Sequence, residues 1–145
     1  MARDIFSILE ADHRELFRLL DEVDRAAESQ RQGVFDHLWT EFEAHTLAER
    51  EILYDRLRDD PLARQTVLRG EQEHHVVESI FRELHRLRPD SERFAAKLHV
   101  VRELMRHHVD EEEHDLFPKA RQILGEKEPA VLGEQFNRRR RGLVT

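Results

Sequence analysis

The chain of 145 residues contains no cysteine, so it can form neither a disulfide framework nor a metal site built on thiolates. Any metal ion would have to be bound by nitrogen and oxygen ligands. Glycine and proline are also scarce, at five and four residues, which disfavours a sheet protein rich in turns. No apolar run approaches the ~18 residues of a membrane span, and the N-terminal stretch MARDIFSILEADHRE is charged too early for a signal peptide. We therefore expect a cytoplasmic protein with no membrane association.

The residues that are abundant indicate long helices. Hydrophobic residues make up 39% of the chain and charged residues 38%, a balance typical of solvated helices with apolar stripes. The formal net charge of −7 argues against nucleic acid or an anionic membrane as the main partner. The length suits one domain, which would bury roughly two-thirds of the surface of the unfolded chain. Ten histidines are an unusually high number, and their meaning depends on their positions.

Apolar residues recur at spacings of three and four in four stretches, each bounded by turn or capping residues. We expect helices over residues 4–27, 34–58, 61–87 and 92–124, with Pro118 kinking or breaking the last one. Because the connections are short, consecutive helices should lie antiparallel, giving an all-α, up-down-up-down four-helix bundle over residues 1–125. Residues 126–145 would form a C-terminal tail, in which Val131, Leu132 and Phe136 could pack as a short helix. The run from Arg138 to Arg141 is expected to be solvated.

Polar residues interrupt each apolar stripe near its middle. They are His13 on the first helix, His45 and Glu49 on the second, His74 and Glu78 on the third, and His108 and Glu112 on the fourth. A histidine and a glutamate four residues apart lie on one helix face, one turn apart, where both can reach the same ion or adjacent ions. Counting from the loops at 1.5 Å per residue places most of the seven within about two helical turns of a common level.

Burying three carboxylates and four imidazoles without partners would cost several kcal/mol for each charged group, which a domain of ~5 to 15 kcal/mol net stability cannot tolerate. Metal ions would compensate these groups. Seven nitrogen and oxygen ligands overfill a tetrahedral zinc site, but they suit two five- or six-coordinate ions, iron or manganese, bridged by carboxylates and solvent. A single such residue is usually only a polar core residue, so the prediction depends on the joint set.

Three further pairs have the same separation but lie one residue off their stripes, which turns them by about 100° toward solvent. They are His37 and Glu41, His99 and Glu103, and His107 and Glu111, and we interpret them as solvated faces. An internal repeat favours His108 and Glu112 over the neighbouring pair. HTLAEREILY from His45 aligns with HVDEEEHDLF from His108 at an offset of 63 residues, and DHRELFRLL around His13 aligns with EHHVVESIF around His74 at an offset of 61. The chain would therefore consist of two helical hairpins, each with its own ligands.

These stretches, with HTLAE and HVDEEEHDLFP the most specific, resemble the hemerythrin family, in particular the bacterial HHE cation-binding domain, over about residues 5–124. The resemblance implies two iron ions with an oxo or hydroxo bridge, manganese being the second choice. The ligands it implies are His13, His45, Glu49, His74, His108 and Glu112. The chain departs from hemerythrin at Glu78, where the family has a second histidine. It also departs at Glu112, which follows its histidine by four residues, whereas the family has an aspartate at five.

A third carboxylate would stabilise the ferric state and disfavour reversible carriage of oxygen. We therefore expect a di-iron protein that reacts with peroxide, O2 or nitric oxide in a protective or iron-oxidising role, as an oxidoreductase. A module that only binds or senses O2 or iron, and a metal-free bundle that binds a partner, are the alternatives. Glu49 and Glu112 would bridge the ions, the four histidines would be terminal ligands, and Glu78 a terminal ligand or a supporting group. The only tyrosine, Tyr54, is a candidate for a phenol near the irons. It lies about 180° around its helix from His45, however, so we favour packing at the surface or flank.

Overall fold

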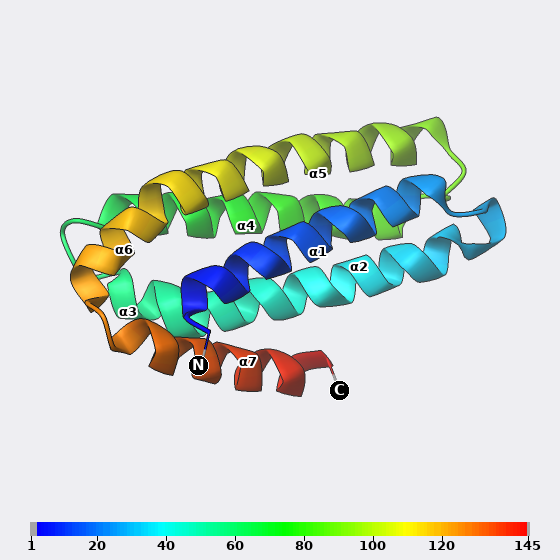
Figure 1. Ribbon diagram of the computed structural model, residues 1–145. Coiled ribbons are helices and arrows are strands. Elements are labelled where there is room, and N and C mark those ends of the chain that lie inside the picture. The colour runs from blue at the N-terminus through cyan, green and yellow to red at the C-terminus, as the bar shows by residue number, and fades with distance from the viewer. Residues whose placement is uncertain (1–2, 145) are drawn as a thin grey trace.

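The computed structural model describes residues 3–144, and those residues form helices and turns with no strand among them. Long helices lie side by side in the first part of the chain, and the chain reverses direction from each to the next (Figure 1). They are α1 (Ile5–Arg25), α2 (Glu28–Glu49), α4 (Arg64–His85) and α5 (Glu92–Glu111). The prediction of an all-α protein is confirmed. None of the described helices is both long and apolar enough to cross a membrane.

Two of the long helices continue through a π-helical segment. The helix α2 passes into η1 (Arg50–Tyr54) and α3 (Asp55–Leu57), and α5 passes into η2 (Glu112–Leu116) and α6 (Phe117–Leu124). In a π-helix the hydrogen bonds run from i to i+5, so each residue turns by less than the roughly 100° of an α-helix. Side chains beyond such a segment therefore face a different direction from the one that α-helical spacing predicts. The irregularity expected near Pro118 is found directly before it, in η2.

Two helix starts differ from the prediction. The second helix begins at Glu28 instead of after Gly33, because the residues before that glycine are good helix formers and the reversal needs only Ala26 and Ala27. The following helix, α4, begins at Arg64, three residues later than Pro61. The Asp60 side chain accepts a hydrogen bond from the backbone of Leu62 at 2.9 Å and so holds a turn there.

The core is divided into two apolar clusters. One surrounds Phe6, Leu9, Leu53 and Phe117, and the other surrounds Leu16, Phe35, Phe42, Phe81, Phe94 and Leu98. Along α1 the change from one cluster to the other falls between Leu9 and Leu16, where His13 lies. Along the second helical stretch it falls between Phe42 and Ala48, where His45 lies, and Glu49 follows Ala48 directly. A polar layer therefore crosses the core between the two apolar clusters. Burial of each large apolar side chain in these clusters stabilises the fold by about 1.5 to 3 kcal/mol.

The C-terminal tail forms a fifth long helix. Gly125, with φ of 74°, ends α6, and α7 (Glu128–Val144) then packs along α1 and α2, as Figure 1 shows. Leu132 and Phe136 are buried as expected, whereas Val131 is 52% exposed, because only one face of α7 contacts the bundle. At Gly133 the helices approach so closely that a Cβ atom would lie 2.7 Å from the Arg3 carbonyl oxygen.

The arginine run in α7 is not simply solvated, as the sequence led us to expect. The Arg139 side chain donates to Glu51 at 2.7 Å, and the Arg140 side chain donates to Asp12 at 3.0 Å and also to Glu41. The tail folds as a helix, and this turns Arg140 toward α1 and α2, where acidic groups are half-buried. The position of Arg140 matters for the site described next, because Asp12 also contacts a histidine of the polar layer.

Candidate metal centre

The structure brings six of the seven predicted side chains together in the polar layer. They are His13, His45, Glu49, His74, His108 and Glu112, from α1, the second helical stretch, α4 and the α5–η2 stretch. Five of them are at most 8% exposed, and His74 is half-buried. Five of the six lie inside regular α-helical segments or at their ends, and Glu112 is the first residue of η2. The spacing of 3.6 residues per turn therefore predicts their direction correctly.

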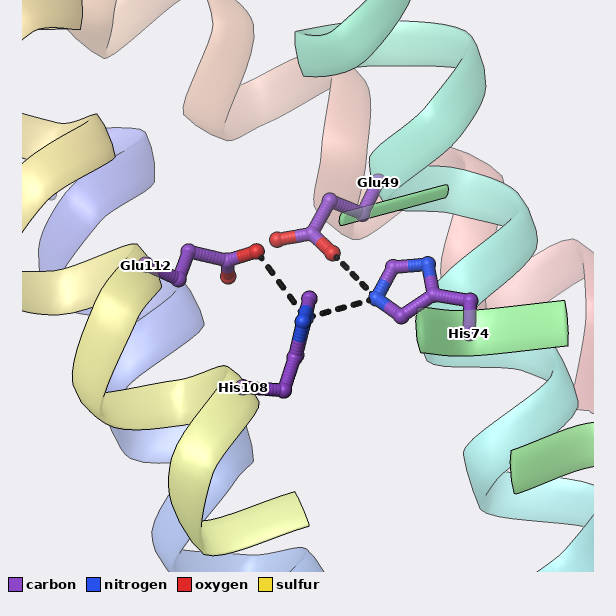
Figure 2. A group of neighbouring side chains, drawn as sticks. All are labelled: Glu49, His74, His108 and Glu112. Carbon is purple, nitrogen blue, oxygen red and sulfur yellow. Dashed lines mark hydrogen bonds and ion pairs between the residues drawn. The ribbon is translucent and has the colours of Figure 1, made fainter. Parts of the chain in front are cut away.

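The two carboxylates lie between two pairs of imidazoles. Glu49 Oε1 is 3.3 Å from His74 Nε2 and 3.8 Å from His45 Nε2. Glu112 Oε1 is 3.1 Å from His13 Nε2, and Glu112 Oε2 is 3.3 Å from His108 Nε2. Figure 2 shows one half of this arrangement, with the Nε2 atoms of His74 and His108, 2.8 Å apart, pointing toward the carboxylates. Each carboxylate therefore faces an imidazole of both pairs.

Several polar atoms of the layer lack a hydrogen-bond partner although they are buried. They are His13 Nε2, both carboxylate oxygens of Glu49, and Glu112 Oε1. A buried polar atom without a partner costs about 1 to 3 kcal/mol, and native proteins contain few of them. A cation would satisfy all four, because each can donate a lone pair. Two groups have ligand atoms that all lie within 4.8 Å of one another. One consists of His13, His45 and Glu49, and the other of Glu49, His74, His108 and Glu112. The residues present therefore fit metal ions.

Three of the histidines are oriented by carboxylates on their outer side. Nδ1 of His13 bonds Glu113, Nδ1 of His45 bonds Asp12, and Nδ1 of His108 bonds Glu73, each at 2.7 Å. Such a bond holds the proton on Nδ1 and leaves the Nε2 lone pair free to bind a metal, and it makes that nitrogen more basic. The sequence analysis missed these supporting carboxylates. One signal was available, since Asp12–His13 and Glu73–His74 are acid–histidine pairs at equivalent positions of the internal repeat.

The buried charges shift one another's pKa values. Burial lowers the pKa of His13 and His108, but the neighbouring carboxylates, Glu112 among them, outweigh burial and raise these pKa values to about 8 and about 9. Burial and the nearby Glu112 charge raise the pKa of Glu49 well above its usual value. Burial also lowers the pKa of His74 well below its usual value. Without a cation the layer therefore retains protons, and a metal ion would have to displace them.

Tyr54 lies in the layer, which corrects the expectation that it packs at the surface or flank. It is fully buried, its hydroxyl donates to Glu112 Oε2 at 2.6 Å, and its ring stacks on His74 with centroids 5.4 Å apart. The prediction failed because Tyr54 ends the π-helical segment η1, which turns it away from the direction of an uninterrupted α-helix. A glycine makes room for it, since a Cβ atom at Gly70 would lie 2.6 Å from the Tyr54 hydroxyl.

Glu78, predicted as a terminal ligand or a supporting group, does not lie with the other six predicted side chains and belongs to none of the groups of possible ligands among the described residues. Its carboxylate accepts a hydrogen bond from Trp39 Nε1 at 3.3 Å and lies 3.7 Å from Arg82. Trp39 precedes Glu49 on α2 by ten residues, about 15 Å along the axis, so Glu78 lies beyond the level of the polar layer. The spacing of four residues from His74 predicts the helix face of Glu78 correctly, but not its position along the bundle axis. The competing histidines His37, His99 and His107 are exposed, as predicted.

A helical protein whose core is crossed by buried histidines and carboxylates belongs to the class of cation-binding helical domains. The model of the hemerythrin HHE cation binding domain family matches residues 4–120. The fold is similar to the crystal structure of a hemerythrin HHE cation binding domain-containing protein from Mycobacterium kansasii, with a TM-score of 0.86 and 21% identity over 98% of this chain and 88% of that one. No curated protein matches the sequence significantly. The chain is therefore a member of the hemerythrin HHE cation-binding domain family, as its resemblance to that family predicted.

Proposed function

We propose that this chain is a non-haem di-iron protein, an antiparallel up-down-up-down bundle that reacts with peroxide, O2 or nitric oxide in a protective or iron-oxidising role. The observation that carries the proposal is the position of Glu49 and Glu112 between two imidazole pairs, with three of their buried oxygens lacking a hydrogen-bond partner. Carboxylates placed in this way suit bridges between two adjacent ions. Six nitrogen and oxygen ligands shared by two ions suit five- or six-coordinate iron or manganese better than tetrahedral zinc.

The proposed ligands divide into two halves. His13 and His45 would hold one ion, His74 and His108 the other, and Glu49 and Glu112 would bridge them. Tyr54 is a further candidate ligand for the second ion, because its hydroxyl already contacts Glu112. Bound iron would supply Lewis acidity and one-electron redox chemistry. The protein's own part is to orient the imidazoles through Asp12, Glu73 and Glu113, and to exclude bulk water with the apolar clusters on both sides.

A groove of about 750 Å³ between α2 and α4 supports reaction with a small molecule from solution. Thr40, Ala44 and Leu47 line it on one side, and Gln72 and His74 line it on the other. The groove therefore reaches a proposed ligand, and His74 is the one member of the polar layer that is only half-buried. A site that served only to store ions would need no such opening for a further ligand.

The test is the metal content, the visible spectrum and the reactivity of the purified protein. We expect two iron ions per chain, absorption bands of ferric iron, and consumption of peroxide or nitric oxide that chelation abolishes. His45→Ala should lose iron, whereas His99→Ala, which alters an exposed histidine outside the layer, should keep both ions. A colourless protein that takes up no iron would refute the proposal. Two bound irons without consumption of either substrate would favour a binding or sensing module.

A further inference from the structure

A second group of metal-type ligands lies on the surface next to the buried centre. Glu73 on α4 and His107 and Glu111 on α5 each offer a ligand atom within 4.8 Å of the others. His107 Nε2 is 3.0 Å from Glu111 Oε2 and 3.5 Å from Glu73 on the facing helix. The His107 side chain is 69% exposed, so the group is open to ions in solution. We call these three residues the outer cluster.

One carboxylate joins the outer cluster to the buried centre. Glu73 Oε1 bonds His108 Nδ1 at 2.7 Å, while Glu73 Oε2 faces His107. The same side chain therefore orients a proposed ligand of the buried centre and contributes to the outer cluster. A cation bound to Oε2 would withdraw negative charge from this carboxylate, so the outer cluster and the buried centre are electrostatically coupled.

A small cavity lies between the two groups of ligands. Its volume is about 10 Å³, and its lining includes Glu73 and Glu111 of the outer cluster and Tyr54, His108 and Glu112 of the buried layer. Such a volume holds roughly one water molecule. A bare divalent cation is smaller than a water molecule, so the cavity has room for one between the outer cluster and the buried ligands.

We propose that the outer cluster is a weak binding site for a divalent cation such as Fe²⁺ or Mn²⁺, through which the buried centre is loaded. One imidazole and two carboxylates, with water in the remaining positions, match the preference of these ions. The Arg69 side chain lies 3.0 Å from Glu111 Oε1 and competes for that carboxylate, which keeps the binding weak and the ion exchangeable. The loading role depends on the proposed di-iron function, whereas binding at the outer cluster does not.

Binding is tested with Mn²⁺ alone, titrated into the purified protein and followed by water proton relaxation. We expect the wild type to bind one more Mn²⁺ than His107→Ala, with the affinity for that ion lowered at least tenfold in the variant. His99→Ala is the matched control, because His99 and Glu103 have the same spacing on α5, with 3.9 Å between them, and the His99 side chain is as exposed as that of His107, at 70% and 69%. They belong to no group of three possible ligands among residues 3–144. Equal Mn²⁺ binding in the wild type and His107→Ala would overturn the outer site.

Loading is tested by mixing metal-free protein with Fe²⁺ and following iron uptake with time. We expect uptake to be about tenfold slower in His107→Ala and in Glu111→Gln, with the same final iron content as in the wild type and the normal rate in His99→Ala. Normal uptake rates in both outer-cluster variants would overturn the loading role. A wild type that takes up no iron would refute the proposed function, and with it the loading role, while the Mn²⁺ titration would still decide whether the outer site exists.

Discussion

Asp12→Asn tests whether the supporting carboxylates set the affinity of the buried centre. Asp12 Oδ2 accepts hydrogen bonds from His45 Nδ1 at 2.7 Å and from Arg140 Nε at 3.0 Å. Burial raises the pKa of Asp12, but His45 and Arg140 outweigh burial and keep it below the usual value, so the group is ionised at neutral pH. An asparagine has nearly the same shape and its amide oxygen can face the same two donors, so the substitution removes mainly the charge.

We expect the affinity for metal to fall by about 10- to 100-fold, the range typical of outer ligand partners, which corresponds to about 1.4 to 2.7 kcal/mol. The upper end is the better expectation at this position. Without the Asp12 carboxylate, the positive charge of the Arg140 guanidinium near His45 is no longer neutralised. That charge repels a metal ion bound by His45 and weakens its binding further.

The measurement is a competition titration in which a chelator of known affinity removes the metal from each variant. Asp21→Asn is the matched control, since Asp21 lies on the same helix and accepts a bond from Arg102 at 2.7 Å, far from the polar layer. The control should keep the affinity of the wild type. If Asp12→Asn and Asp21→Asn release metal at the same chelator concentration, the carboxylate does not act through His45.

Two further predictions concern the metal-free and the iron-loaded protein. Tyr54→Phe should lower the free energy of unfolding of the metal-free protein by about 1 to 3 kcal/mol, because Glu112 Oε2 loses its hydrogen-bond donor at 2.6 Å. It should also remove any phenolate-to-iron band from the iron-loaded protein. Unchanged urea denaturation and an unchanged spectrum would contradict this prediction. The raised pKa values of His13, about 8, and His108, about 9, stabilise the metal-free fold below pH 6.5, and this contribution is lost as the pH rises through 8 and 9. Urea denaturation should thus show a loss of about 4 kcal/mol between pH 6.5 and 9 without metal, and a constant or rising stability would count against these shifts.

The helical pattern predicts the site well as long as the helices are regular. His13 and His74 lie in helices that contain no π-helical segment among the described residues, and the other four predicted residues lie before such a segment or at its first residue. The spacing of 3.6 residues per turn therefore still gives their direction. Tyr54 lies at the end of η1, and there the same spacing gives a wrong direction. No proline marks η1, so the sequence offers no local reason for the change, whereas Pro118 does mark the region of η2.

Other features could not be predicted from the spacing within one helix because they depend on neighbouring helices. Glu78 has the correct face but the wrong height, and only the position of Trp39 shows where its carboxylate is held. Asp12 and Glu73 precede ligands by one residue, so each points away from its own ligand, yet each contacts a histidine of the next helix. Arg140 contacts Asp12 only because α7 packs against the bundle, which the sequence near the chain end does not indicate. Periodicity describes one helix at a time, and these contacts each require two.

The internal repeat explains both the similarity and the difference of the two halves of the site. Asp12 supports His45 in the first hairpin as Glu73 supports His108 in the second. Aromatic residues at the repeat offset of 63 also correspond. Tyr54 lies parallel to the His74 ring within 9°, and Phe117 lies parallel to the His13 ring within 12°. At this pair of positions the halves differ by one hydroxyl, which Tyr54 has and Phe117 lacks.

The two halves of the site also differ in how far neighbouring elements enclose them. The side of His45 is covered by α7, whose Phe136 ring lies 6.0 Å from the imidazole, whereas the groove between α2 and α4 reaches His74. In the proposed di-iron centre the two ions would therefore be inequivalent. The ion at His13 and His45 would be enclosed by apolar groups. The ion at His74 and His108 would have a phenol beside it and a path to solvent, so a small molecule arriving through the groove would meet that ion first.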